Sequence, residues 1–173
     1  MQHVLRKKIL DVLETCQDMA VGTVRPDGAP QVTVVSFVND GMLIYFGCGA
    51  NSQKGRNIKA ESRVSVAMTA PYTDWMAIKG LSLAADAEEV TEAEELALVW
   101  RLITERFPQV TQIEAPPDVA MTVIRLRPTV VSVLDYSKGF GHTDLVSIEA
   151  DEIAESLESM RHHWLVPVPP AGG

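Results

Sequence analysis

The segment that begins at Ser52 has the residue types and spacing of an anion-binding helix start. Ser52 is a favourable N-cap, and Lys54 and Arg56 follow it in the first turn of the expected helix. A helix N-terminus presents unpaired N–H groups and a partial positive charge, so cations there are unfavourable unless an anion is bound. A phosphate bound by these N–H groups, Ser52 and Lys54 would neutralise them, and Gly55 would let the backbone approach closely.

This basic cluster is unusual for the chain. Residues 52–63 carry four cationic side chains against Glu61, a local charge of +3, whereas the whole chain has a formal net charge of −8. A solvent-exposed basic turn of no functional importance is the alternative interpretation, since such turns contribute little energy. The local chemistry alone leaves both interpretations open.

Other phosphate-related functions are not supported. Gly47-x-Gly49-x-x-Ser52 lacks the third glycine of the dinucleotide fingerprint and follows hairpins instead of a βαβ unit. A Walker motif is absent, because no Gly-Lys-Ser/Thr triplet follows Lys54. The negative net charge argues against nucleic acid as a partner. No metal site is expected.

The elements around this segment predict an α+β fold with a mainly antiparallel sheet and flanking helices. Alternating and β-branched runs predict the strands, and turn residues at Pro26-Asp27-Gly28 and Asn39-Asp40-Gly41 predict that the first three form a meander. The expected strands are 19–24, 31–38, 42–46, 64–68, 75–90 and 121–134. Gly80 suggests a bulge, and Pro128 requires a bend or an edge position.

Helical patterns predict four helices in one domain covering residues 1–173. Apolar spacing predicts a helix over residues 4–16, the Ser52 helix ends near Glu61, and Thr91 with Glu94 has capping-box spacing before a helix that stops at Pro108. A last helix is expected over about 151–164, followed by a loose tail.

The order of motifs between residues 19 and 90 resembles that of the pyridoxamine 5'-phosphate oxidase-like superfamily, the FMN-binding split barrels. The shared features are a strand, Asp27-Gly28, a second strand, Asn39-Asp40-Gly41, a strand ending Ile44-Tyr45-Phe46, Ser52-x-Lys54-Gly55, Asn57-Ile58 and Arg63-Val64. The resemblance implies a split β-barrel that binds FMN.

The resemblance also implies the cofactor-binding residues. Residues bordering the isoalloxazine ring would be Thr33, Val34, Val35 and Ser36. Tyr45, Phe46 and Gly47 would line its neighbourhood. Residues approaching the ribityl phosphate would be Ser52, Gln53, Lys54 and Asn57. Family members usually pair as homodimers with flavin at the interface, so Trp75 or the loop 139–142 of a second chain would complete each site.

The chain departs from the true pyridoxamine-phosphate oxidases at its C-terminus. It ends Met160-Arg-His-His-Trp-Leu-Val-Pro instead of supplying their arginine-containing closing motif, which argues against vitamin B6 oxidation. The resemblance implies an FMN-dependent oxidoreductase that passes hydride or electrons to a small organic acceptor or oxygen. A noncatalytic protein that binds or senses FMN or haem is the alternative, and deazaflavin is another possible cofactor. His142 is a candidate proton donor, or an ordinary exposed histidine.

The expected cellular location depends on whether the sequence contains a membrane span or a secretory signal. No stretch reaches the apolar length of a membrane span, and no secretory signal is readable at the N-terminus, so we expect a cytoplasmic protein. Cys16 and Cys48 are expected to be free thiols. The expected partners are a small-molecule substrate of unknown identity and a second copy of the chain.

Overall fold

Apolar and polar residues alternate along most strands, so each of these strands has one buried and one exposed face. The structure, a computed structural model, describes residues 3–113 and 119–154. Its strands are β1 (Asp18–Val24), β2 (Pro30–Ser36), β3 (Val38–Asp40), β4 (Leu43–Gly49), β5 (Arg63–Thr69), β6 (Lys79–Glu89), β7 (Met121–Asp135) and β8 (Thr143–Ser147). Its helices are α1 (His3–Thr15), α2 (Gln53–Ala60) and α3 (Ala93–Arg106), with short 3-10 helices η1 (Trp75–Ala77), η2 (Pro108–Gln112) and η3 (Tyr136–Lys138).

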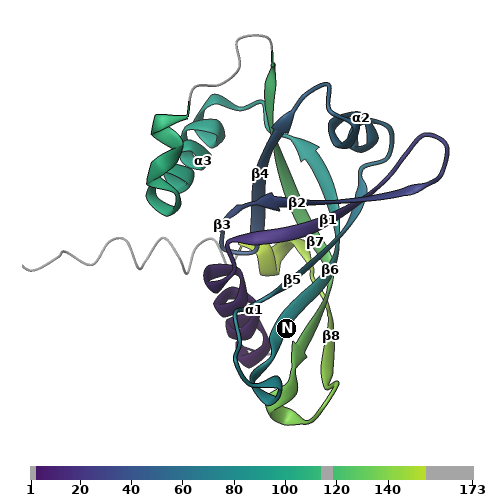
Figure 1. The fold of residues 1–173 in the computed structure, drawn as a ribbon, viewed down its shortest axis with the longest axis vertical. Helices are drawn as coiled ribbons and strands as arrows, with labels where there is room; N and C mark the ends of the chain where they lie inside the picture. The colour runs from purple at the N-terminus through teal and green to yellow at the C-terminus, as the bar shows by residue number, and fades with distance from the viewer. Residues whose placement is uncertain (1–2, 114–118, 155–173) are drawn as a thin grey trace, which may run out of the picture.

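The strands form one curled antiparallel sheet. Their order is β2-β1-β5-β6-β7-β4-β3, and β8 pairs with β7 beyond the point where β4 ends. β2 and β4 are far apart in this order, yet the curl brings them into contact without strand pairing (Figure 1). The barrel is therefore split between β2 and β4. The expected α+β split barrel with flanking helices is confirmed.

The helix α1 covers the end of the sheet opposite α2 (Figure 1). Ile9, Val12 and Leu13 form its buried stripe, as the spacing predicted, and pack into the hydrophobic core. At the edge of this contact, the Lys8 ammonium donates a hydrogen bond to the Asp135 carboxylate at the end of β7. Asp135 is almost fully buried, so this ion pair ties α1 to the sheet.

The second expected strand, residues 31–38, is in fact two strands, and the expected meander is wrong. The chain breaks at Phe37, after which β3 pairs with β4 while β2 pairs with β1. The turns themselves are confirmed, because Gly28 and Gly41 both adopt positive φ angles. The meander fails because the chain changes pairing partners at Phe37, so that β2 and β3 lie at opposite ends of the strand order.

The irregularity of the sheet lies away from Gly80. The register between β6 and β7 shifts at Ala84 and Ala85, where β7 carries an extra residue next to Pro128. Proline has no N–H to donate, and Pro128 lies where β7 has left β4 and has not yet joined β8. Pro128 thus lies at a locally unpaired edge of β7, one of the two expected positions, and the register shift beside it marks the expected bend. Only glycine fits at position 80, because a Cβ there would lie 2.7 Å from the Met68 carbonyl oxygen.

The starts of two expected elements also change, and the start of a third lies close to its expected position. Residues 75–77 form η1, and the strand predicted from residue 75 begins at Lys79. The capping box is wrong, because α3 has Glu92 as its N-cap and no side-chain capping bond. The last helix begins at Ala150, and its expected continuation to residue 164 lies outside the described residues. In the described part of the chain, no helix has the length and hydropathy needed to cross a membrane.

The buried carboxylate of Asp135 predicts a loss of stability in acid. Burial alone would raise the pKa of Asp135, but hydrogen bonds from Lys8 and Ser137 outweigh it and hold the pKa at about 2, below the ordinary 3.8. A group with a depressed pKa in the folded state stabilises the fold above its unfolded pKa and loses that effect as the pH falls through the folded value. Between about pH 4 and pH 2, the free energy of unfolding from urea titrations should fall by roughly 2 kcal/mol through this group.

Asp135→Asn should be less stable at neutral pH and should lose this part of the pH dependence. Asp86→Asn, at an exposed carboxylate on β6, is the matched control and should keep the wild-type slope. An Asp135→Asn profile parallel to the wild type across this range would show that the Lys8 pair does not stabilise the fold.

Candidate functional site

The turn from β4 into α2 holds the expected anion-binding residues in a fixed geometry. Ser52 is the N-cap of α2, and its hydroxyl oxygen accepts a 3.1 Å hydrogen bond from the N–H of Gly55. A Cβ at Gly55 would lie 2.8 Å from the Ala50 carbonyl oxygen, so this glycine is required by the turn itself. The N–H groups of Gln53 and Lys54 precede any intrahelical acceptor and are available to a ligand.

Lys54 lies beside this helix start and reaches across to β2. Its ammonium is 3.1 Å from the hydroxyl oxygen of Thr33 and 5.4 Å from the ring centroid of Phe46. Partial burial lowers the pKa of Lys54, although the nearby Cys48 opposes this. A bound anion would therefore compensate a cation that has lost part of its hydration.

The other two expected phosphate ligands, Gln53 and Asn57, already form hydrogen bonds within the protein. The amide nitrogen of Gln53 donates to the side-chain oxygen of Asn57, while its oxygen accepts from Arg56. Asn57 is fully buried, and its amide nitrogen donates to Thr23 and Gln31. Asn57 thus fastens α2 to β1 and β2, and contact with a phosphate would require it to exchange these bonds.

The four expected ring-binding residues lie along β2, at the open end of the sheet. Thr33 and Val35 are half-buried, whereas Val34 and Ser36 point to the exposed face. Ser36 donates a 2.6 Å hydrogen bond to Asp18. Because β2 ends the strand order, its outer edge offers main-chain groups toward the split. A planar ring could meet this edge without requiring all four side chains on one face.

An apolar cavity of about 250 Å³ adjoins this edge. Ser36, Tyr45, Phe46 and Gly47 line it, which brings four of the expected residues together. The rest of its lining was not expected from the sequence: Phe37, Val38, Ile103, Phe107, Gln109, Val110 and Ile113. The apolar stripe of α3 was the available signal, but nothing in that pattern says which cavity the stripe faces.

Tyr45 connects the cavity to a buried polar network. Its hydroxyl donates a 2.9 Å hydrogen bond to Glu95 on α3, and Glu95 also pairs with Arg125 at 2.8 Å. Burial, with the hydrogen bond to Glu95 second, raises the pKa of Tyr45. The phenol therefore stays neutral and holds α3 against β4.

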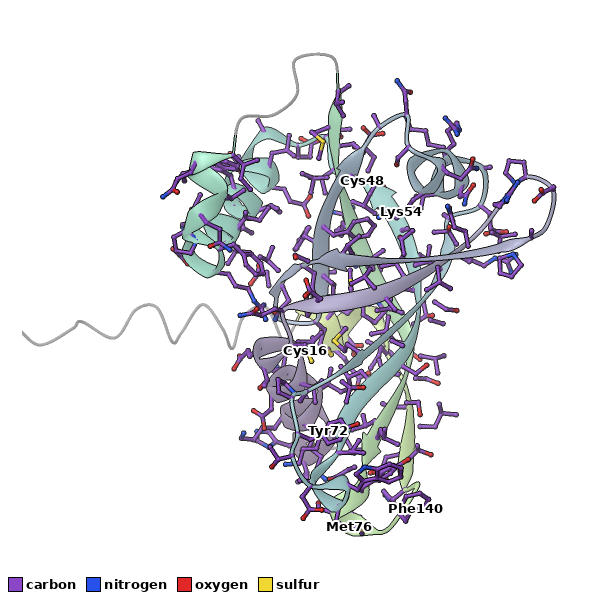
Figure 2. The ribbon with its side chains drawn as sticks, viewed as in Figure 1. Cys16, Cys48, Lys54, Tyr72, Met76 and Phe140 are labelled. Carbon is purple, nitrogen blue, oxygen red and sulfur yellow. The ribbon has the colours of Figure 1, made fainter. Side chains whose placement is uncertain are left out.

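The weaker candidates lie at the other end of the molecule. Figure 2 places Lys54 near α2 and Phe140 at the opposite end of the sheet. Trp75 is exposed and stacks on Phe140, with ring centroids 6.2 Å apart. His142 has its Nε2 3.2 Å from Asp144. These residues do not meet Lys54 within one chain, so a role at the same site would require a second chain.

The comparisons with known proteins agree with this architecture. The family model described as pyridoxamine 5'-phosphate oxidase matches residues 5–135, which is more than half of the chain. No match was found among curated proteins.

Solved structures with similar folds have different described functions. A heme-binding protein from Mycobacterium smegmatis is 20% identical with a TM-score of 0.70, over 89% of this chain and 60% of its own longer chain. A conserved hypothetical protein from Mycobacterium tuberculosis is 26% identical with a TM-score of 0.66, over 87% of this chain and 93% of its own. An F420 reductase is 29% identical with a TM-score of 0.56, over 70% of this chain and 94% of its own. Together with the split barrel, the family match shows that this chain belongs to the pyridoxamine 5'-phosphate oxidase family.

Proposed function

We propose that this protein binds FMN at the split between β2 and β4 and acts as an FMN-dependent oxidoreductase. The observation that carries the proposal is the partly buried Lys54 ammonium at the start of α2, held between Thr33 and Phe46. This is the donor set that a phosphate monoester requires: a cation, free helix N–H groups and a glycine turn.

The cavity beside β2 supports the ring half of the proposal. Phe46 both contacts Lys54 and lines the apolar cavity, so a phosphate held by Lys54 and an attached planar ring would lie next to one residue. Apolar walls with few polar groups suit a flavin ring, whose orientation is set by hydrogen bonds at its edge. The outer edge of β2 would provide main-chain groups for those bonds.

When bound, FMN would supply the hydride- or electron-transfer chemistry, and the protein would bind, orient and shield it. Lys54 and the first N–H groups of α2 would hold the phosphate. The apolar side chains of η2 and α3, with Phe37, would exclude water from the ring. Tyr45, kept neutral by burial and by Glu95, would hold the cavity wall in place.

Deazaflavin is the second candidate cofactor, favoured by the likeness to an F420 reductase. Haem is the third, since a heme-binding protein shares the fold. The absorption spectrum of the purified protein, with mass spectrometry of the released ligand, distinguishes the three. Flavin bands that bleach with NADH or NADPH and recover in air would support the oxidoreductase. A Soret band, or a colourless protein that ignores added FMN, would contradict it.

Lys54→Ala tests the phosphate site. Loss of one charge-assisted hydrogen bond costs about 1.5 to 3 kcal/mol, so FMN should bind roughly ten- to a hundredfold more weakly, as measured by fluorescence titration. Riboflavin has no phosphate, so its affinity should be lower in the wild type and nearly unchanged by the substitution.

Lys59→Ala is the matched control for this test. Lys59 lies on the same helix but is exposed, 4.0 Å from Glu89, so its removal should leave FMN binding nearly unchanged. If Lys54→Ala binds FMN as tightly as the wild type, the phosphate assignment is wrong.

We also propose that the protein is a homodimer through the exposed face of the sheet. Val32 and Val34 on β2 are 66% and 72% exposed, and Val34 is itself one of the expected ring-binding residues. Adjacent exposed valines are more typical of an interface than of a monomer surface. A second copy there would also bring residues from another chain near the flavin.

Light scattering of the flavin-bound protein should give twice the chain mass of 18.9 kDa, about 38 kDa. Val32→Glu should shift the mass toward the monomer, because it buries a charge in the proposed interface. Val4→Glu, at an exposed valine on α1, should remain dimeric. A monomeric wild type with flavin bound would exclude a site shared between chains.

A further inference from the structure

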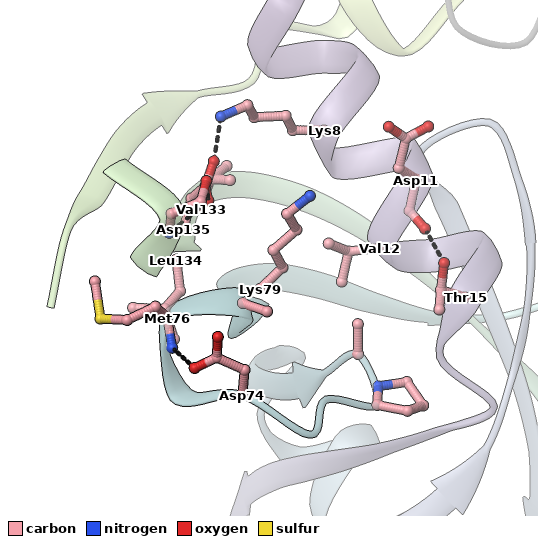
Figure 3. Close-up of a pocket in the computed structure, with 14 residues that line it drawn as sticks. Lys8, Asp11, Val12, Thr15, Asp74, Met76, Lys79, Val133, Leu134 and Asp135 are labelled. Carbon is pink, nitrogen blue, oxygen red and sulfur yellow. Dashed lines mark hydrogen bonds and ion pairs between the residues drawn. The ribbon is translucent and has the colours of Figure 1, made fainter. Parts of the chain in front are cut away.

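A second cavity, of about 460 Å³, lies at the end of the sheet opposite α2. Its walls come from three places: the C-terminal half of α1, the connection from β5 to β6, and the end of β7 with η3 (Figure 3). The volume is within the range of sites that bind small molecules. Nothing in the proposed flavin site uses these residues.

The carboxylates that line the cavity are already bonded within the protein. Asp135 accepts hydrogen bonds from Lys8 and Ser137. Asp11 forms a 2.7 Å ion pair with Lys7, and Asp74 caps η1 by accepting from the N–H of Met76. Asp135 and Asp11 are thus each paired with a lysine, whereas Asp74 accepts only a backbone N–H and keeps its negative charge.

Lys79 is different. It begins β6, and Figure 3 shows its side chain extending toward α1, into the space between the helix and the sheet. In residues 3–113 and 119–154, its ammonium forms no hydrogen bond or ion pair. Lys8 and Lys79 are the two lysines of this lining, and Lys79, which is exposed, is the one with no ion-pair partner among the described residues.

The other residues that line the cavity are mostly apolar, so the part of a ligand that contacts them should be apolar as well. Val12 on α1 and Val133 and Leu134 on β7 line the cavity, with Ala70, Pro71 and Met76. A ligand that fits must combine one anionic group with an apolar body. Because Asp11, Asp74 and Asp135 surround the same space, a dianion would be repelled more strongly than a monoanion.

We propose that this cavity is a second binding site, specific for a small monocarboxylate with an aromatic or branched aliphatic body, whose carboxylate pairs with Lys79. The apolar body lies against Val12, Val133 and Met76. The site is separate from the flavin and does not depend on the proposed oxidoreductase activity.

The probe is sodium benzoate, titrated into the isotope-labelled full chain with and without saturating FMN. A ligand of roughly nine non-hydrogen atoms should bind with a Kd of about 1 mM. The methyl signals of Val12, Met76 and Val133 should shift. Benzamide has the same ring without the charge and should bind more weakly.

Lys79→Met keeps the apolar stem and removes the charge, so it should weaken benzoate binding at least fivefold and leave benzamide binding unchanged. Lys59→Met, at an exposed lysine on α2, is the matched control and should bind benzoate like the wild type. Unchanged signals from the rest of the sheet would show that both variants are folded.

Three results would overturn the proposed site, and a fourth would overturn its ligand class. The first is the absence of methyl shifts at about 10 mM benzoate, roughly ten times the expected Kd. The second is equal benzoate affinity in Lys79→Met and wild type. The third is displacement of benzoate by FMN, which would assign the binding to the flavin site. Inorganic phosphate that competes as strongly as benzoate would overturn the monocarboxylate class.

Discussion

The pairing of β7 with three other strands is the constraint on which the rest of the structure depends. One side of β7 pairs with β6 along almost its full length, while the other side pairs first with β4 and then with β8. Pro128, without an N–H, lies at this change of partner, and the extra residue beside it bends the strand. Beyond this bend β7 pairs with β8, and its last residue, Asp135, contacts Lys8 on α1 and lines the second cavity.

At the α2 end, the structure keeps a cation in a place that is costly for it. Partial burial removes water from Lys54, and the helix start adds its own positive potential. The hydrogen bonds of Asn57 and the close packing of Gly55 fix the start of α2 in place. Such preorganisation lowers the ordering cost of binding an anion, because the donors are already in position.

At the α1 end, the buried charge of Asp135 is compensated by other residues of the same chain. Asp135 is satisfied by Lys8 and Ser137, so the charge stabilises the contact between helix and sheet and requires no ligand. Among the described residues, each end therefore has one lysine without an ion-pair partner. These are Lys54 beside the split and Lys79 at the mouth of the second cavity. Solved structures that share this fold are described with different ligands, so the fold alone does not fix the ligand.

Local signals in the sequence were enough to predict α1, the Ser52 cap of α2, the glycine turns and an antiparallel sheet, because each depends on residues only a few positions apart. The motif order also led to the correct family. Only the tertiary structure decided that β2 and β3 belong to opposite ends of the sheet, since periodicity defines the faces of a strand and not its partner. The same holds for Asn57, which a helical pattern cannot distinguish from a surface residue. Its partners Thr23 and Gln31 are 34 and 26 positions away, and only the packing of α2 against the paired strands β1 and β2 brings Asn57 to them.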